Sequence, residues 1–216
     1  MADNTYRALV VRESQDGKFS CAVENLTREK LPAGDALVRV RYSSLNYKDM
    51  LSASGNRGVT RKYPHTPGID AAGTIEESAS PDFKAGEEVI VTSYDLGMNT
   101  SGGLGQYIRV PASWVVKKPA NISLRESMIF GTAGFTAGLS ALRLIDHGIK
   151  EGCSVLVTGA TGGVGSVAVS ILSHAGCRVT AVNGINDETA FLESIGASEI
   201  IPIPDTAESA GRPLLK

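Results

Sequence analysis

The sequence predicts an α/β protein in which a β-rich N-terminal domain is followed along the chain by the first half of a doubly wound parallel sheet. Short strand patterns separated by glycine and proline turns fill about the first 120 residues. Helix and strand patterns then alternate, as they do in parallel α/β sheets. The apolar run 155–157 breaks into glycines and leads into a helical pattern. We therefore predict two domains, residues 1–120 and 121–216.

The N-terminal domain is predicted from alternating and turn-bounded segments. Val38, Val40 and Tyr42 alternate with arginines, which is the pattern of a half-buried strand. Residues 88–92 and 106–110 are further short strand patterns. Glycine or proline turns separate these segments, at residues 16–17, 32–35, 67–68 and 84–86. Closely spaced strands of this kind favour a small barrel or sandwich.

The C-terminal domain is predicted to open with a helix. Ser123 and Glu126 match a capping box, and the helical pattern reaches about His147 with an interruption near Gly131 and Gly134. The elements expected after it are strand 155–158, helix 163–175, strand 178–182, a helix over about 187–195 and strand 199–203. This βαβαβ order is half of a doubly wound sheet, so we expect the remaining strands to come from further polypeptide.

A glycine motif between the first strand and helix of this unit indicates a phosphate-binding turn. Ala160, Gly162 and Gly165 match the dinucleotide fingerprint, with alanine in the place of its first glycine. Gly162 would let the backbone approach a pyrophosphate, and Gly165 would let the helix pack closely on the strand. The candidate cofactor-binding residues of this turn are Ala160, Thr161, Gly162, Gly163 and Val164. A glycine-rich turn without a ligand is the alternative.

Charge and composition narrow the classes of partner. The 216 residues carry 21 basic and 23 acidic side chains, a net charge of −2 that gives no electrostatic basis for binding nucleic acid or an anionic membrane. The three cysteines are far apart, which indicates reduced thiols and not a disulfide framework. The N-terminus lacks the pattern of a signal peptide, and no apolar run has the length of a membrane span, so we predict a cytoplasmic protein.

Four segments together resemble a known family: Ser43–Asp49, Pro67–Gly73, Gly131–Ala137 and Thr158–Gly165. The chain resembles the zinc-free medium-chain dehydrogenase/reductase superfamily, and within it the acryloyl-CoA reductase and quinone oxidoreductase branch. The resemblance implies a GroES-like domain followed by the first half of a Rossmann doubly wound sheet. It also implies that the chain is truncated at the C-terminus. Because homodimers are common in this superfamily, a homodimer is a further expectation.

The resemblance also implies which chemistry the family members perform. Zinc-containing relatives use a cysteine and a Gly-His-Glu segment as ligands, and the corresponding positions here are Ser44 and 68–70 (Gly-Ile-Asp). The three histidines have no zinc-site spacing, so no metal is expected. Hydride delivery to an activated C=C bond is then the expected reaction, with donors stabilising the enolate.

The predicted function is NADPH-dependent reduction of the C=C bond of a small 2-enoyl thioester, with acryloyl-CoA to propionyl-CoA as the best candidate. NADPH:quinone oxidoreductase activity and a non-catalytic NADPH-binding module are the alternatives. The partner is therefore a small-molecule enoyl thioester or quinone. A cluster of lysines or arginines for the phosphates of coenzyme A is expected, but the sequence does not locate it.

The resemblance assigns roles to residues of both predicted domains. Tyr47 is expected to contact the cofactor and deliver a proton, with Asn46 positioning it, and Thr132 is expected near the nicotinamide carboxamide. Alternatively, Asn46 and Tyr47 cap a turn and pack the ring, while Thr132 bonds back within its helix. Asp49 is interpreted as a structural acceptor of backbone N–H groups. The helix-breaking glycines 131, 134 and 138 favour close approach of a backbone or ligand.

The second strand of the C-terminal unit bears on the choice of cofactor. An acidic residue at its end would hold the ribose hydroxyls of NAD and repel a 2′-phosphate. Asn183, Gly184 and Ile185 stand there instead, and all three are neutral. Relatives often carry Ser-Gly-Arg at this point, with Ile185 in the place of the arginine. We predict that these three residues contact NADPH.

Overall fold

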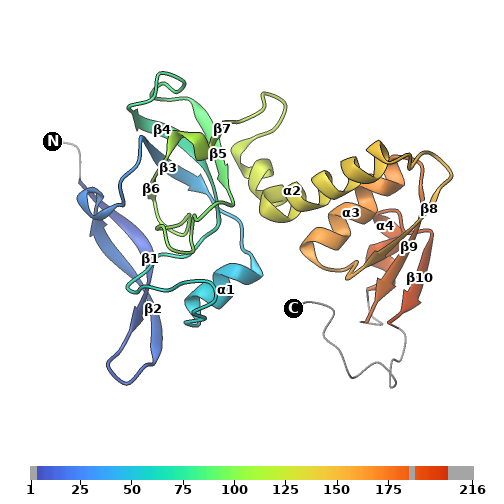
Figure 1. Cartoon of the computed structure of the whole chain (residues 1–216), viewed down its shortest axis with the longest axis horizontal. Coiled ribbons are helices and arrows are strands. Elements are labelled where there is room, and N and C mark those ends of the chain that lie inside the picture. The colour runs from blue at the N-terminus through green and yellow to red at the C-terminus, as the bar shows by residue number, and fades with distance from the viewer. Residues whose placement is uncertain (1–3, 185–187, 204–216) are drawn as a thin grey trace. The chain divides into compact units, whose positions relative to one another are not determined.

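A computed structural model describes residues 4–184 and 188–203. The chain divides into two compact units, Met1–Thr132 and Ala133–Lys216 (Figure 1), and each is described by itself. Unit 1 contains seven described strands: β1 (Thr5–Glu13), β2 (Phe19–Thr27), β3 (Ala36–Tyr42), β4 (Asp70–Ser78), β5 (Glu88–Thr92), β6 (Tyr107–Val110) and β7 (Val115–Lys117). Its short helices are η1 (Arg28–Lys30), α1 (Tyr47–Ala53) and η2 (Ala112–Trp114).

Unit 1 is built from an antiparallel sheet and a hairpin. The sheet has the order β6-β3-β4-β5-β7, and β1 pairs with β2 as a long hairpin (Figure 1). Isolated bridges join Ala8 to Gly105 and Val11 to His65. Side chains of this sheet form a buried aliphatic core that includes Val38, Ile75 and Val91. The β-rich character predicted for this region is confirmed, and β5 has the predicted bounds.

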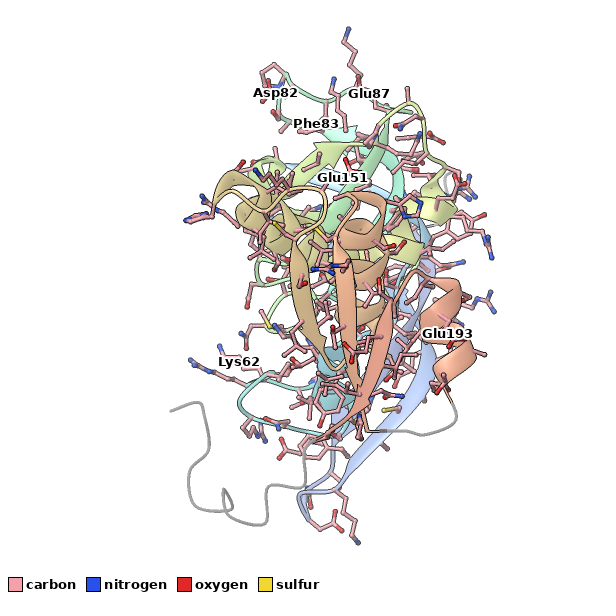
Figure 2. The ribbon with its side chains drawn as sticks, turned by 90° about the vertical axis from the view of Figure 1, so that its right-hand side faces the viewer. Lys62, Asp82, Phe83, Glu87, Glu151 and Glu193 are labelled. Atoms are coloured by element: carbon pink, nitrogen blue, oxygen red, sulfur yellow. The ribbon has the colours of Figure 1, made fainter. Side chains whose placement is uncertain are left out.

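The turn between β4 and β5 is attached to the sheet through side chains. Figure 2 shows Asp82, Phe83 and Glu87 close together in this turn. The Phe83 ring packs against the core, and the Lys117 Nζ lies 5.8 Å from its centroid. Lys117 also forms an ion pair of 3.0 Å with Glu87. The turn is therefore held to the core by the Phe83 ring and to β7 by the cation–π contact and the ion pair of Lys117.

The helix α2 (Leu124–Asp146) begins at the predicted capping box. Ser123 Oγ accepts from the backbone N–H of Glu126 at 3.1 Å, and the Glu126 carboxylate accepts from Ser123 N at 2.7 Å. Leu124 and Met128 pack on Ala72 of the sheet. Because these first turns belong to unit 1, the two compact units divide after Thr132, later in the chain than the predicted boundary at 120.

The course of α2 is interrupted at one of the two predicted glycines. Gly131 has φ 49° and ψ −153°, which is not helical, whereas Gly134 lies within the continuing helix. By length and composition alone, α2 is the one helix of the described residues that could cross a membrane. Its break at Gly131 and the burial of Leu124 and Met128 in a protein core show that it is not one uninterrupted apolar helix.

Unit 2 has the predicted βαβαβ order. Its described strands are β8 (Ser154–Thr158), β9 (Arg178–Asn183) and β10 (Glu199–Pro202), which form a parallel sheet in the order β10-β9-β8. The helices α3 (Gly163–His174) and α4 (Thr189–Ser194) connect them, with Glu193 on α4 labelled in Figure 2. Leu172 and Leu192 share one core with Val179, so both helices cover the same side of the sheet. Among the described strands, β8 pairs on one side only.

Candidate functional site

A buried carboxylate organises the candidate site of unit 1. Asp70 begins β4 and is fully buried. Its Oδ2 accepts from Asn46 Nδ2 at 2.8 Å and from the backbone N–H of Thr132 at 2.9 Å, and its Oδ1 accepts from Thr132 Oγ1 at 2.7 Å. The structure thus brings Asn46 and Thr132 together on one carboxylate. A buried charge with three donors is well satisfied and rigidly placed.

The segment before α1 is fixed by a second carboxylate. Asp49 Oδ2 accepts from the backbone N–H of Asn46 at 2.8 Å, and its Oδ1 accepts from that of Ile69 at 2.9 Å. Burial raises the pKa of Asp49, while its hydrogen bonds from these backbone groups act in the opposite direction. The interpretation of Asp49 as a structural acceptor is confirmed. Asn46 is the N-cap residue of α1, so it serves both the cap and Asp70.

Tyr47 is the first residue of α1 and projects outward. Its side chain is 72% exposed, and Leu45 just before it is 85% exposed. The ring is therefore not packed into the core of unit 1, which was the alternative interpretation from the sequence. A fixed backbone under an exposed phenol is suited to contact a ligand. Asp70 holds the neighbouring Asn46 in place, so the donor at Tyr47 is carried on a rigid segment.

The break in α2 lets the helix approach this carboxylate. A side-chain Cβ on Gly131 would lie 2.6 Å from Asp70 Oδ2 and would also collide with Ser44 Oγ. The positive φ of Gly131 likewise favours glycine. The expected close approach is therefore present at Gly131. It is absent at Gly138, where a Cβ would meet no atom within 4 Å.

The positions that hold zinc in metal-containing relatives are used differently here. Ser44 Oγ donates to the backbone oxygen of Met128 at 2.6 Å, and Asp70 is engaged by Asn46 and Thr132. Within residues 4–184 and 188–203, no three His, Cys, Asp or Glu side chains are grouped to hold a metal ion. His65 lies apart, with its buried Nε2–H donating to the oxygen of Gly97 at 2.9 Å. This donor set does not suit a zinc ion.

The glycine turn of unit 2 has the geometry of a close strand-to-helix connection. A Cβ on Gly165 would lie 2.8 Å from the Cα of Ala160, so α3 can approach the turn only with glycine there. Gly162, Gly163 and Val164 are exposed, while Ala160 is fully buried under them. In any α-helix the first N–H groups have no partner within the helix. The start of α3 therefore presents backbone donors at an open surface, which is the arrangement that binds phosphates.

The end of β9 lies beside this turn. Val182 pairs in register with Thr158, and Thr161 Oγ1 donates to Asn183 Oδ1 at 3.4 Å. Asn183 is buried, whereas Gly184 is exposed. The structure thus brings the predicted residues 160–164 and 183–184 to the same edge of the sheet. Ile185, the third predicted residue, lies outside the described residues.

A hollow of about 470 Å³ in unit 2 borders the same turn. Gly159, Gly162 and Gly163 line it together with β8 and with residues of α2 such as Ser140. A volume of this size is in the range of small-molecule sites. The candidate residues of unit 1 and those of unit 2 form two clusters, each ordered within its own unit.

Asp70 is a functional candidate that reasoning from the sequence did not single out. In the sequence analysis Asp70 appears only as the last residue of segment 68–70, which corresponds to the zinc-binding Gly-His-Glu segment of zinc-containing relatives. Its partners are 24 and 62 residues away in the chain, so no local pattern could have joined them. The signal that was available is an acidic residue opening a buried strand, which requires partners.

The comparisons with known proteins agree with this geometry. Residues 32–120 match the alcohol dehydrogenase GroES-like domain. Over 212 residues the chain is 45% identical to "Putative quinone oxidoreductase YhfP" of Bacillus subtilis, covering 98% of this chain and 64% of that protein. It is 44% identical to the acrylyl-CoA reductase AcuI of Ruegeria pomeroyi, covering 97% and 64%. The resemblance to the quinone oxidoreductase and acrylyl-CoA reductase branch of the medium-chain dehydrogenase/reductase superfamily is confirmed over the length that the chain shares with these relatives.

Solved structures of this superfamily extend the agreement to both units. The yhdH oxidoreductase of Salmonella enterica in complex with NADP matches with a TM-score of 0.90 and 47% identity, covering 97% of this chain and 64% of that one. The Bacillus subtilis protein yhfP with NAD bound matches with a TM-score of 0.88 and 44% identity, covering 93% and 61%. The fold prediction of a GroES-like domain followed by a Rossmann-type sheet is confirmed. The chain spans about 64% of the length of these curated relatives.

Proposed function

We propose that this chain forms the catalytic domain and the first part of the nucleotide-binding domain of a zinc-independent, NADPH-dependent reductase. Its substrate is a small 2-enoyl thioester, with acryloyl-CoA reduced to propionyl-CoA as the leading reaction. The observation that carries the proposal is the exposed Tyr47 on a segment anchored through Asn46 to buried Asp70. The 44% identity to an acrylyl-CoA reductase supports the substrate class.

The chain's own residues have defined parts in this proposal. Backbone donors of the 160–164 turn would bind the pyrophosphate of the cofactor, and the neutral end of β9 would accept the 2′-phosphate. When bound, NADPH supplies the hydride. Tyr47 would hold a proton on its phenol oxygen for the α-carbon of the substrate, while Asn46 orients the segment through Asp70. Thr132, tied to the same carboxylate, would border the nicotinamide.

A quinone oxidoreductase is the second candidate function, favoured by the name of the relative at 45% identity. Both candidates use the same cofactor and share every motif of the chain. A quinone accepts a hydride and then carries its charge on oxygen, so it needs no proton on carbon. The two functions therefore differ in their dependence on Tyr47. A cytoplasmic location and a homodimer remain predictions.

The test combines cofactor binding with turnover of two substrates. NADPH is titrated by fluorescence into the chain and its Gly162→Ala variant, which should bind it about tenfold more weakly because a methyl group blocks the approach of the phosphates. Gly138→Ala, whose added methyl meets no atom within 4 Å, is the control and should bind NADPH normally.

Turnover then separates the functions. Tyr47→Phe should bind NADPH as the parent does but reduce acryloyl-CoA about 100-fold more slowly, the usual loss for a missing general acid. Faster turnover of a simple benzoquinone than of acryloyl-CoA by the parent would favour the quinone function. Normal turnover by Tyr47→Phe would remove its proton-delivery role.

A further inference from the structure

Two hollows on unit 1 share part of their lining close to the candidate catalytic segment. Their volumes are about 560 and 420 Å³, and both are lined by Val40, Arg41 and Gln106. The first continues to Ser43 and Leu45, directly before Asn46 and Tyr47 in the chain. We call the combined hollow the arginine groove. We propose that the arginine groove binds the phosphate groups of a coenzyme A thioester, an inference that rests on the proposed function.

The backbone around Gln106 sets the spacing of the groove. Gln106 N donates to the oxygen of Arg7 at 3.0 Å, and the oxygen of Gln106 accepts from the N–H of Val40 at 2.9 Å. The Gln106 Oε1 also accepts from the backbone N–H of Arg7 at 2.8 Å. Gln106 thus lies between Arg7 of β1 and Val40 of β3, which are two strand spacings, about 10 Å, apart. Arg41 is the next residue of β3 and lines the same hollow as Arg7.

The groove has a surplus of positive charge. Among the described residues, four arginines line it, Arg7, Arg28, Arg39 and Arg41, together with one carboxylate, Glu76. Glu76 pairs with Arg28 at 3.2 Å, so it neutralises none of the other three. Within the described part of the chain, the side chains of Arg7, Arg39 and Arg41 form no ion pair and are exposed. Guanidinium groups bind phosphate oxygens in a bidentate manner.

One arginine of the groove, Arg28, is held in place by its neighbours. Of the buried side-chain nitrogens and oxygens in the described residues, the Nε of Arg28 is the one without a hydrogen-bond partner. The other guanidinium nitrogens of Arg28 are used by Glu76 and by the hydroxyl of Tyr107. The guanidinium of Arg28 also lies over the Tyr107 ring, 4.1 Å from its centroid, so Arg28 is a fixed positive charge at this end of the groove.

The remainder of the groove is apolar and reaches Leu45, two residues before Tyr47 in the chain. Leu9, Val23, Leu45 and Leu104 line this part. A ligand that fills both parts has several negative charges at one end and a long neutral arm at the other. Coenzyme A has this shape, with a phosphorylated nucleotide joined to a pantetheine arm that ends in the thioester. A quinone has no group for the arginines, so the groove favours the thioester over the quinone.

The experiment measures binding directly, without relying on catalysis. Coenzyme A, adenosine 3′,5′-bisphosphate and pantetheine are titrated calorimetrically into the full chain and into the variant Arg7→Gln/Arg41→Gln. We expect the two phosphorylated compounds to bind, pantetheine to bind far more weakly, and the double variant to lose about 100-fold in affinity for coenzyme A, about tenfold per arginine. Arg125→Gln/Arg143→Gln, at two exposed positions outside the groove, is the charge-matched control and should bind as the parent does.

The outcomes separate this proposal from the proposed function. Equal affinity of parent and double variant, or no binding of coenzyme A at millimolar concentration, would overturn the groove assignment. Displacement of coenzyme A by an equal concentration of NADP⁺ would also overturn the groove assignment, because the groove would then be a dinucleotide site. Binding that depends on the arginines without turnover of acryloyl-CoA would support the groove and refute the reductase activity. The double variant could also reduce acryloyl-pantetheine at the parent's rate but no longer reduce acryloyl-CoA. That result would support both the groove assignment and the reductase function.

Discussion

At the scale of single residues, the candidate site of unit 1 depends on Asp70. Its carboxylate receives donors from Asn46 and Thr132, which come from α1's cap and from the break in α2. A carboxylate without water needs these donors, and each donor buried beside it needs the carboxylate. One side chain therefore fixes two segments that the resemblance connects with catalysis.

Replacing Asp70 tests this dependence. Asp70→Asn keeps the shape but presents an amide N–H₂ to groups that are themselves donors. We expect the free energy of unfolding to fall by about 3 kcal/mol, the usual range for losing charged hydrogen bonds in a buried site. Urea denaturation measures it. The control Glu77→Gln, on the same strand but exposed, should change stability by less than about 0.5 kcal/mol. Equal stability of Asp70→Asn and the parent would contradict the anchoring role.

His65 gives the molecule a predicted dependence on pH. Burial lowers the pKa of its imidazole from 6.5, and the neutral ring donates to Gly97. As the pH falls below about 6.5, the unfolded chain gains a proton at this position before the folded chain does, so stability falls. In His65→Gln we expect a smaller loss between pH 7 and pH 5. Urea midpoints at the two pH values measure it, with exposed His174→Gln as the control. The same loss in parent and His65→Gln would refute this origin.

At the scale of elements, α2 shows how one glycine sets the path of a helix. Its capping box and its apolar face come from local sequence, but the break comes from a collision. At Gly131 any side chain would meet Asp70 and Ser44. Seven residues later, Gly138 has helical geometry and free space around its Cα. The two glycines therefore predict opposite effects of the same substitution.

The pair of alanine variants tests this prediction. Gly131→Ala should lower the free energy of unfolding by about 3 kcal/mol or more, from backbone strain and the contact with Asp70. Gly138→Ala should raise it by about 0.5 to 1 kcal/mol, because alanine favours the helix and nothing opposes its methyl group. Thermal and urea unfolding of both variants measure these changes. Similar effects at the two positions would show that helix propensity, and not the approach to Asp70, governs Gly131.

At the scale of the whole molecule, the two units have separate cores. The first is an aliphatic core within an antiparallel sheet, and the second lies between a parallel sheet and its two helices. Each candidate cluster belongs to one unit, with the phenol and carboxylates in the first and the glycine turn in the second. Units with their own cores can unfold as separate cooperative steps.

Core truncations in each unit test their independence. Ile75→Ala and Leu172→Ala remove side chains that are each 2% exposed, so each should cost about 3 kcal/mol. We expect the first to shift only the unfolding of unit 1 and the second only that of unit 2. The fluorescence of Trp114, which is half-buried against the core of unit 1, reports the unfolding of that unit, and amide hydrogen exchange distinguishes the two units. A single transition that both variants shift equally would show that the units unfold together.

Local sequence determined the elements that depend on neighbouring residues. The capping box at Ser123, the strand 88–92 and the βαβαβ order around the glycine turn are encoded in short patterns, because caps, alternation and turns involve residues a few positions apart. The close packing at Gly165 was predictable for the same reason. The four segments together added the resemblance to a family, and the comparisons confirm that resemblance.

Only the tertiary structure decided what depends on distant residues. The hydrogen bonds of Asp70 join positions 24 and 62 residues apart, and Gln106 joins β1 to β3 across the arginine groove. The exposure of Tyr47 and the division after Thr132 likewise follow from packing between segments. Such contacts exist because buried polar groups must find partners wherever the fold brings them. A short sequence window contains the side chain that needs a partner but not the partner itself.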